Sequence, residues 1–108
     1  MRGRIWLESD GVRFFGPGPL ELLEKIDQTG SISKAARQMK LSYKKALGIV
    51  NRVNENCQIP LVIMNQGGEH GGGSQLTVSG REMMAYYKEL CNRFTGFTEQ
   101  ETIRRNGK

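Results

Sequence analysis

Hydrophobic and polar residues repeat with different periods along the chain, and these periods predict a mainly α-helical fold with a small β part. Residues 3–8 and 12–15 alternate loosely around the turn sequence Ser9-Asp10-Gly11, which predicts a short β-hairpin. The following apolar residues are spaced three apart, as on one side of a helix, and prolines open this segment. A helix is therefore predicted over residues 17–29, with Gly30 ending it.

Two further helices are predicted, each behind a serine that can act as an N-cap. Ser33 is predicted to cap a short helix with an alanine-rich buried side, and Ser42 to cap a helix from Tyr43 to about Glu55. At 100° per residue, one side of this second helix is formed by Ala46, Val50, Val53 and Asn54. The opposite side carries Lys44, Lys45, Gly48, Asn51, Arg52 and Glu55.

The period changes again after Pro60. Residues 61–64 and 76–78 are predicted strands on either side of a glycine-rich loop. Residues from about 61 to 78 are therefore predicted to form a second hairpin, which is called the wing below. The capping-box pattern Ser79-Gly-Arg-Glu82 predicts a last helix over about 79–97. Hydrophobic residues in this helix follow the heptad interval of a dimer seam, at Met83, Tyr87, Leu90, Phe94 and Phe97. One domain is predicted over residues 1–98, followed by a frayed tail over residues 99–108.

Composition narrows the class of protein. The 108 residues suffice for one domain, and the mean hydropathy of -0.51 with 25% charged residues indicates a globular protein. No apolar run is long enough to cross a membrane, and acidic residues interrupt the N-terminal stretch too early for a signal peptide. Two cysteines and one histidine make neither a disulfide framework nor a zinc set. A cytoplasmic protein with reduced thiols, no metal and no membrane contact is expected.

The positive charge is concentrated in one segment. The net charge is +5, and residues 28–54 contain six basic and no acidic residues. The rest of the chain holds the other ten basic residues and all eleven acidic residues, so its net charge is close to zero. Solvated helix faces usually mix both signs, whereas a one-signed segment attracts a polyanion.

A basic amphipathic helix behind a short helix and a tight turn is typical of the helix-turn-helix unit. Its apolar side holds it in the protein while its basic side enters the major groove of double-stranded DNA. The predicted DNA-binding residues are Ser33, Lys34, Arg37, Ser42, Tyr43, Lys44, Lys45, Gly48 and Arg52. The predicted wing contacts are Gly67, Gly68, His70, Gly71, Gly72 and Gly73. The turn residue Lys40 is expected at positive φ, where lysine costs roughly 1 kcal/mol relative to glycine.

Other functions are weaker alternatives. The glycine cluster lacks the GK[ST] ending of a phosphate-binding loop, and no carboxylate pair, triad or metal cluster stands out, so neither an enzyme nor a cofactor is predicted. Tyr43 is either a DNA contact or part of the core edge, and Cys57 is a candidate redox sensor. The remaining alternative is a protein–protein module built on the same fold, although exposed apolar anchors are missing from the basic face.

The chain resembles the N-terminal domain of the molybdate-responsive regulator (ModE) family. The resemblance rests on Gly30-Ser-Ile-Ser-Lys-Ala-Ala36, on Leu41-Ser-Tyr-Lys44, and on the doubled glycine cluster before Leu76-Thr77. It implies a winged helix-turn-helix protein that dimerises through its flanking helices and binds palindromic operators.

The sequence also departs from the family pattern. Glu69 and Met64 stand where the family often has basic residues, while Lys45 and Arg52 make the predicted recognition helix more basic. Family members sense molybdate with C-terminal oxyanion-binding domains, and this chain ends where those would begin. A homodimer that binds DNA and does not bind molybdate is therefore expected.

Overall fold

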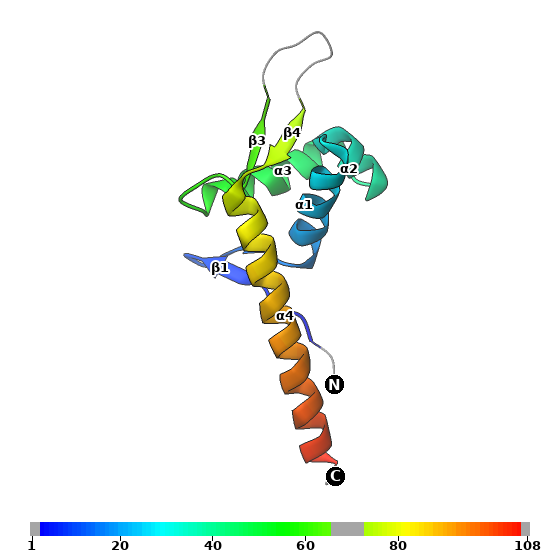
Figure 1. Ribbon diagram of the computed structural model, residues 1–108, viewed down its shortest axis with the longest axis vertical. Helices are drawn as coiled ribbons and strands as arrows, with labels where there is room; N and C mark the ends of the chain where they lie inside the picture. The colour runs from blue at the N-terminus through cyan, green and yellow to red at the C-terminus, as the bar shows by residue number, and fades with distance from the viewer. Residues whose placement is uncertain (1–2, 66–72, 107–108) are drawn as a thin grey trace.

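The computed structural model describes residues 3–65 and 73–106 (Figure 1). The elements follow in the order β1 (Leu7–Ser9), β2 (Val12–Phe15), α1 (Pro17–Thr29), α2 (Ile32–Gln38), α3 (Tyr43–Glu55), β3 (Val62–Met64), β4 (Ser74–Leu76) and α4 (Val78–Arg105). The paired strands β3 and β4 lie at one end of the molecule, and both chain termini lie at the other (Figure 1).

Helices α1, α2 and α3 form the body of the domain. Helix α1 has the predicted bounds and ends at Gly30, whose φ of 72° lets its N–H donate to the carbonyl oxygen of Ile26 at 2.7 Å. The N-cap of α2 is Ser31 and not Ser33, because Ile32 must already be helical for its side chain to reach the core. Ser33 lies one residue inside the helix and is exposed to solvent.

Two antiparallel hairpins complete the domain. In the first, β1 pairs with β2 around a turn in which Asp10 and Gly11 both have positive φ. In the second, Val62 pairs with Leu76 and Met64 with Ser74. The returning strand is therefore residues 74–76 and not 76–78. Thr77 is not part of this strand, because it is the N-cap of α4. Its hydroxyl donates to the carbonyl oxygen of Pro60 at 2.7 Å.

Helix α4 starts earlier and ends later than predicted. Its N-cap is Thr77, whose Oγ1 accepts the N–H of Gly80 at 3.0 Å, so the predicted capping box at Ser79 does not form. Gly80 lies against the carbonyl oxygen of Leu61, where a Cβ atom would clash. The helix has 28 residues and continues to Arg105, so the expected frayed tail is wrong for residues 99–105.

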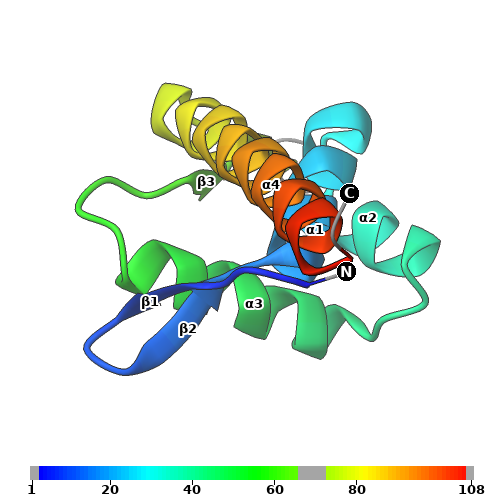
Figure 2. The same cartoon turned by 90° about the horizontal axis from the view of Figure 1, so that it is seen from below.

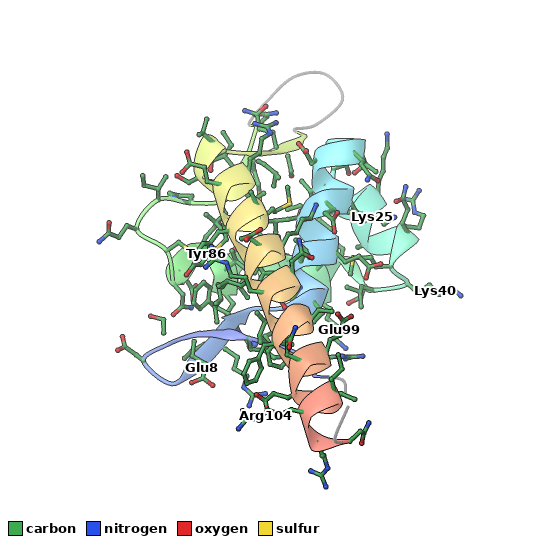
Figure 3. The ribbon with its side chains drawn as sticks, turned by 60° about the horizontal axis from the view of Figure 1, so that its bottom comes forward. Glu8, Lys25, Lys40, Tyr86, Glu99 and Arg104 are labelled. Atoms are coloured by element: carbon green, nitrogen blue, oxygen red, sulfur yellow. The ribbon has the colours of Figure 1, made fainter. Side chains whose placement is uncertain are left out.

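The far half of α4 extends beyond the rest of the domain and gives the molecule extents of 63 × 28 × 22 Å (Figure 1). Glu99 and Arg104 lie on this projecting half (Figure 3). The N-terminal segment runs beside α4, since the hydroxyl of Tyr87 donates to the carbonyl oxygen of Ile5 at 2.7 Å. Gly3 lies against the ring of Phe94, where a side chain would not fit.

One hydrophobic core joins all of these elements. Its largest fully buried side chains are Tyr87, Phe15, Leu22, Leu23, Ile26, Leu61, Val50 and Val53. Helix α1 packs against both α3 and α4, and α3 lies on the other side of the molecule from the start of α4 (Figure 2). The architecture is mainly α-helical with a small β part, as predicted, and is that of a winged helix-turn-helix domain.

Candidate nucleic-acid interface

The turn between α2 and α3 has the backbone geometry of a helix C-cap. Leu41 N–H donates to the carbonyl oxygen of Ala36 at 2.9 Å, and Lys40 N–H donates to that of Arg37 at 3.1 Å. This pair of bonds defines a Schellman motif, in which the residue after the C-cap adopts a left-handed conformation. Lys40 occupies that position with φ 58°, so the predicted positive φ is confirmed. Its side chain projects away from the body of the protein (Figure 3).

Helix α3 has the predicted cap, bounds and two-sided character. The Oγ of Ser42 accepts the N–H of Lys45 at 3.1 Å. Ala46, Val50 and Val53 are buried in the core. The residues of the opposite face are all exposed, namely Lys44, Lys45, Gly48, Asn51, Arg52 and Glu55. Tyr43, which the sequence left between two roles, is 50% exposed and therefore accessible to a ligand.

An open hollow of about 460 Å³ lies on the outer face of α3. Three of the residues that line it are cationic, and one is a glycine. Its lining residues are Ser42, Lys44, Lys45, Gly48, Ile49 and Arg52. The hollow therefore combines a bare stretch of helix with three cationic side chains, which suits an anionic partner that approaches α3 closely.

None of the basic residues within residues 28–54 forms an ion pair with a described carboxylate, whereas five basic residues elsewhere do. Five ion pairs occur between described residues, and their cations are Arg13, Arg81, Lys88, Arg93 and Arg104. All five cations lie outside residues 28–54. The six basic residues of that segment are Lys34, Arg37, Lys40, Lys44, Lys45 and Arg52. Within the described chain none of these six is neutralised by a carboxylate, so their charge is available to an external ligand.

Asn54 fixes the end of α3 to strand β3. Its Nδ2 donates to the carbonyl oxygen of Val62 at 2.9 Å, while its Oδ1 accepts the N–H groups of Leu61 and Val62 at 2.9 and 3.2 Å. This explains why an asparagine falls on the apolar side of α3. The helical period predicts that Asn54 lies on the inner side of α3. It does not predict the three hydrogen bonds, because their partners belong to another segment of the chain.

The base of the wing is anchored to the turn before α2. Ser74 N–H donates to the carbonyl oxygen of Gly30 at 2.8 Å, and Asn65 N–H donates to that of Gly73 at 2.8 Å. Of the predicted wing contacts, Gly73 lies at this base, where a Cβ atom would meet the carbonyl oxygen of Gly30 at 2.9 Å. The others, Gly67, Gly68, His70, Gly71 and Gly72, lie outside the described residues.

The predicted dimer seam on α4 is partly wrong. Tyr87 is 1% exposed and packs edge-on against Phe15, with ring centroids 5.2 Å apart, so it belongs to the core of its own domain. Met83, Leu90 and Phe94 are half-buried. A heptad stripe on a helix can pack against its own domain or against a second chain. In this protein Tyr87, near the middle of the stripe, packs against its own domain.

Among the exposed apolar residues of α4, the predicted seam included Phe97 but missed Tyr86 and Ile103. Tyr86, Phe97 and Ile103 are 57%, 59% and 50% exposed. At 100° per residue, Tyr86 and Phe97 fall with Leu90 within an arc of about 40°. For Tyr86 the signal was present in the sequence, one residue away from the predicted seam residue Tyr87.

Other candidate chemistry receives little support from the geometry. Burial raises the pKa of the Cys57 thiol, which disfavours the thiolate that a redox sensor needs. No group of three potential metal ligands occurs among the described residues, and none of their helices is long and apolar enough to span a membrane.

The three-helix body, the tight turn before α3 and the β3–β4 hairpin together define a winged helix-turn-helix domain. A solved LysR family transcriptional regulator has a similar fold, with a TM-score of 0.57, 17% identity and coverage of 81% of this chain and 28% of that chain. A scan against protein-family models found no match.

Several curated proteins are similar to most of this chain. The molybdenum transport protein ModE of Azotobacter vinelandii is 39% identical over 87 residues, which are 81% of this chain and 32% of that protein. The molybdenum-pterin-binding protein MopB of Rhodobacter capsulatus is 43% identical over 83 residues, or 77% and 30%. The DNA-binding transcriptional dual regulator ModE of Escherichia coli K12 is 36% identical over 78 residues, or 72% and 30%.

The chain is therefore a homologue of the N-terminal domain of the ModE and Mop proteins, which confirms the resemblance found in the sequence. It spans about a third of the length of the curated relatives that it matches.

Proposed function

We propose that this chain is a sequence-specific transcription regulator that binds double-stranded DNA through α3. The carrying observation is that residues 28–54 hold six basic and no acidic residues, and that none of the six pairs with a described carboxylate. Unneutralised lysines and arginines on one face are the electrostatic basis of binding to phosphates. The name of the Escherichia coli relative, a DNA-binding regulator, supports the same assignment.

Five of the basic residues on α2 and α3 have a proposed role. Lys44 and Lys45 stand in the first turn of α3 and are proposed to reach base edges, since an exposed α-helix fits a major groove about 12 Å wide. Arg52 lies two turns further along the same face and is proposed to contact a phosphate. Lys34 and Arg37 on α2 are exposed beside the turn and are proposed to hold the flanking backbone.

The proposal includes a homodimer formed through α4. Tyr86, Leu90 and Phe97 would form its seam, with Tyr86 and Phe97 more than half exposed in the single chain. The projecting half of α4 packs on little of its own domain, which favours a partner helix (Figure 1). A two-fold symmetric protein would recognise a palindromic site. The proposed location is the cytoplasm, where a bacterial chromosome is accessible, and no enzymatic activity is proposed.

The test is selection of bound fragments from random double-stranded DNA, followed by fluorescence anisotropy on the selected site. Lys44→Ala/Lys45→Ala is expected to lower affinity for the selected site at least about thirtyfold, because two contacts of about 1–3 kcal/mol each are lost. Arg104→Ala/Arg105→Ala removes the same charge from the end of α4 and serves as the matched control. Failure to enrich any sequence would overturn the proposal and favour a protein-binding role.

Arg52→Ala separates phosphate contacts from base contacts. It is expected to weaken selected and unrelated DNA alike and to lower the slope of log affinity against log salt by about one. A loss confined to the selected site would instead place Arg52 at a base edge.

Molybdate is not proposed as a ligand of these 108 residues. The anion-binding feature available in the sequence is the glycine cluster of the wing, and Glu69 within it would repel an oxyanion. Molybdate at a hundred times a given Kd would stabilise a binding protein by about 2.7 kcal/mol. A saturable shift of the melting temperature with molybdate, absent with sulfate, would contradict this expectation.

A further inference from the structure

Gly48 occupies the centre of the exposed face of α3. Residues three and four positions away are its neighbours on the helix surface, and these are Lys44, Lys45, Asn51 and Arg52. All four are exposed and polar, and three of them are cationic. The residue that they surround has no side chain.

The protein itself gives no reason for a glycine at this position. A Cβ atom on Gly48 would have open space around it, with no atom of another element within 4 Å. Gly48 does not have a positive φ, unlike Gly11 and Gly30 among the described residues. Gly80, by contrast, lies against the backbone of Leu61 and cannot carry a side chain. A glycine in the interior of a helix destabilises it relative to alanine, so Gly48 lowers stability without improving any internal contact.

The hollow on α3 indicates what the missing side chain makes room for. Gly48 lies in it between Lys44, Lys45 and Arg52, and the space of about 460 Å³ is open to solvent. A glycine in such a place allows another molecule to approach the helix backbone closely. Phosphates can be reached from a distance by the long basic side chains, whereas base edges lie at the bottom of the groove.

We propose that Gly48 is a specificity-determining residue that lets the edge of a base pair come into van der Waals contact with the backbone of α3. This inference rests on the proposed function and adds to it that the depth of α3 in the groove is set at Gly48. A side chain at this position would hold α3 away from the bases. The phosphate contacts, made by flexible lysines and arginines, would persist.

The test compares Gly48→Ala and Gly48→Leu with Gly96→Ala. Gly96 is a matched control, since it is also an exposed glycine inside a helix, and a Cβ atom added to it would meet no atom of another element within 4 Å. Gly48→Ala and Gly96→Ala should each raise the melting temperature by about 4 °C. Affinity for the selected site should fall about tenfold for Gly48→Ala and at least about a hundredfold for Gly48→Leu. Affinity for unrelated DNA should change less than about twofold, and Gly96→Ala should bind both DNAs like the parent chain.

The outcomes separate this inference from the proposed function. If the parent chain binds a selected site and both Gly48 variants bind it equally well, the inference is overturned and the function stands. An equal loss on selected and unrelated DNA would also overturn it, because general binding would then depend on Gly48. If the parent chain selects no DNA at all, the proposed function fails. Leucine is nearly as good a helix former as alanine, so circular dichroism should show Gly48→Leu folded.

Discussion

Asn54 and Val62 are joined by two hydrogen bonds, one from Nδ2 to the carbonyl oxygen of Val62 at 2.9 Å and one from Val62 N–H to Oδ1 at 3.2 Å. The same Oδ1 accepts the N–H of Leu61. One side chain therefore ties the end of α3 to the first strand of the wing. The proposed recognition helix α3 and strand β3 of the wing are consequently held in a fixed relative position. A protein that contacts DNA with both a helix and a wing needs such a fixed arrangement.

Asn54→Ala should lower the free energy of unfolding by about 2 kcal/mol, because part-buried backbone groups of Leu61 and Val62 lose their partner. Urea unfolding measures the change. Asn56→Ala is the matched control, since the Asn56 amide donates to the exposed carbonyl oxygen of Arg52 at the same helix end. Its cost should stay below about 1 kcal/mol. Equal costs for the two variants would contradict a special role of Asn54.

Lys40 combines an unfavourable backbone conformation with a useful charge. Its φ of 58° favours glycine, and its side chain projects from the turn before α3 (Figure 3). Lys40→Gly should raise the free energy of unfolding by about 1 kcal/mol while weakening DNA binding and lowering the salt slope by about one. Thermal melts and anisotropy titrations at several salt concentrations measure the two effects.

Lys40→Ala provides the control, because it removes the same charge and keeps a Cβ atom at positive φ. It should weaken DNA binding as much as Lys40→Gly does, without the gain in stability. If both variants bound DNA like the parent chain, Lys40 would lie outside the interface.

Much of this fold could be predicted because its signals are local. Gly30 at the end of α1, Ser42 at the start of α3 and the two faces of α3 all follow from residues within one or two turns. Ser33 was mistaken for the cap of α2 because Ser31 is an equally good N-cap residue by type. The choice depends on Ile32, which must face a core assembled from distant elements.

The errors on α4 have the same origin. Spacing alone shows that Tyr87 lies on an apolar stripe, but it does not show which surface covers the stripe. The N-terminal segment covers it, as the bond from Tyr87 to Ile5 demonstrates. Likewise Thr77, rather than Ser79, caps α4 because its hydroxyl is also held by the carbonyl oxygen of Pro60. Contacts between segments far apart in sequence decided each of these points.

The revised seam makes a prediction about assembly. Tyr86→Glu/Phe97→Glu places two charges on the proposed seam and should convert the protein to a monomer at tens of micromolar, as measured by sedimentation equilibrium. Val78→Glu/Ile103→Glu is the matched control, since both residues are exposed and lie about a third of a turn away around α4. The control should remain a dimer. A parent chain that is itself monomeric would contradict the proposed dimer.

Tyr87 should control the alkaline stability of the protein. Burial, with a smaller contribution from neighbouring Cys91, raises its pKa from the ordinary value of 10.0 to about 12. In the unfolded chain the hydroxyl loses its proton near pH 10, while in the folded protein it keeps the proton and its bond to the carbonyl oxygen of Ile5. A pKa raised by folding gives stability that is fully present below pH 10 and is lost as the pH rises toward 12.

Tyr87→Phe isolates this effect, because it keeps the ring beside Phe15 and removes the titrating group. At neutral pH the variant should be less stable by about 1 kcal/mol, the typical value of one hydrogen bond. Between pH 10 and 12 its free energy of unfolding should fall less steeply than that of the parent chain, because the group whose pKa is raised by folding is absent. Urea unfolding at intervals across this range measures the difference. Parallel curves for the two proteins would show that Tyr87 does not carry the alkaline transition.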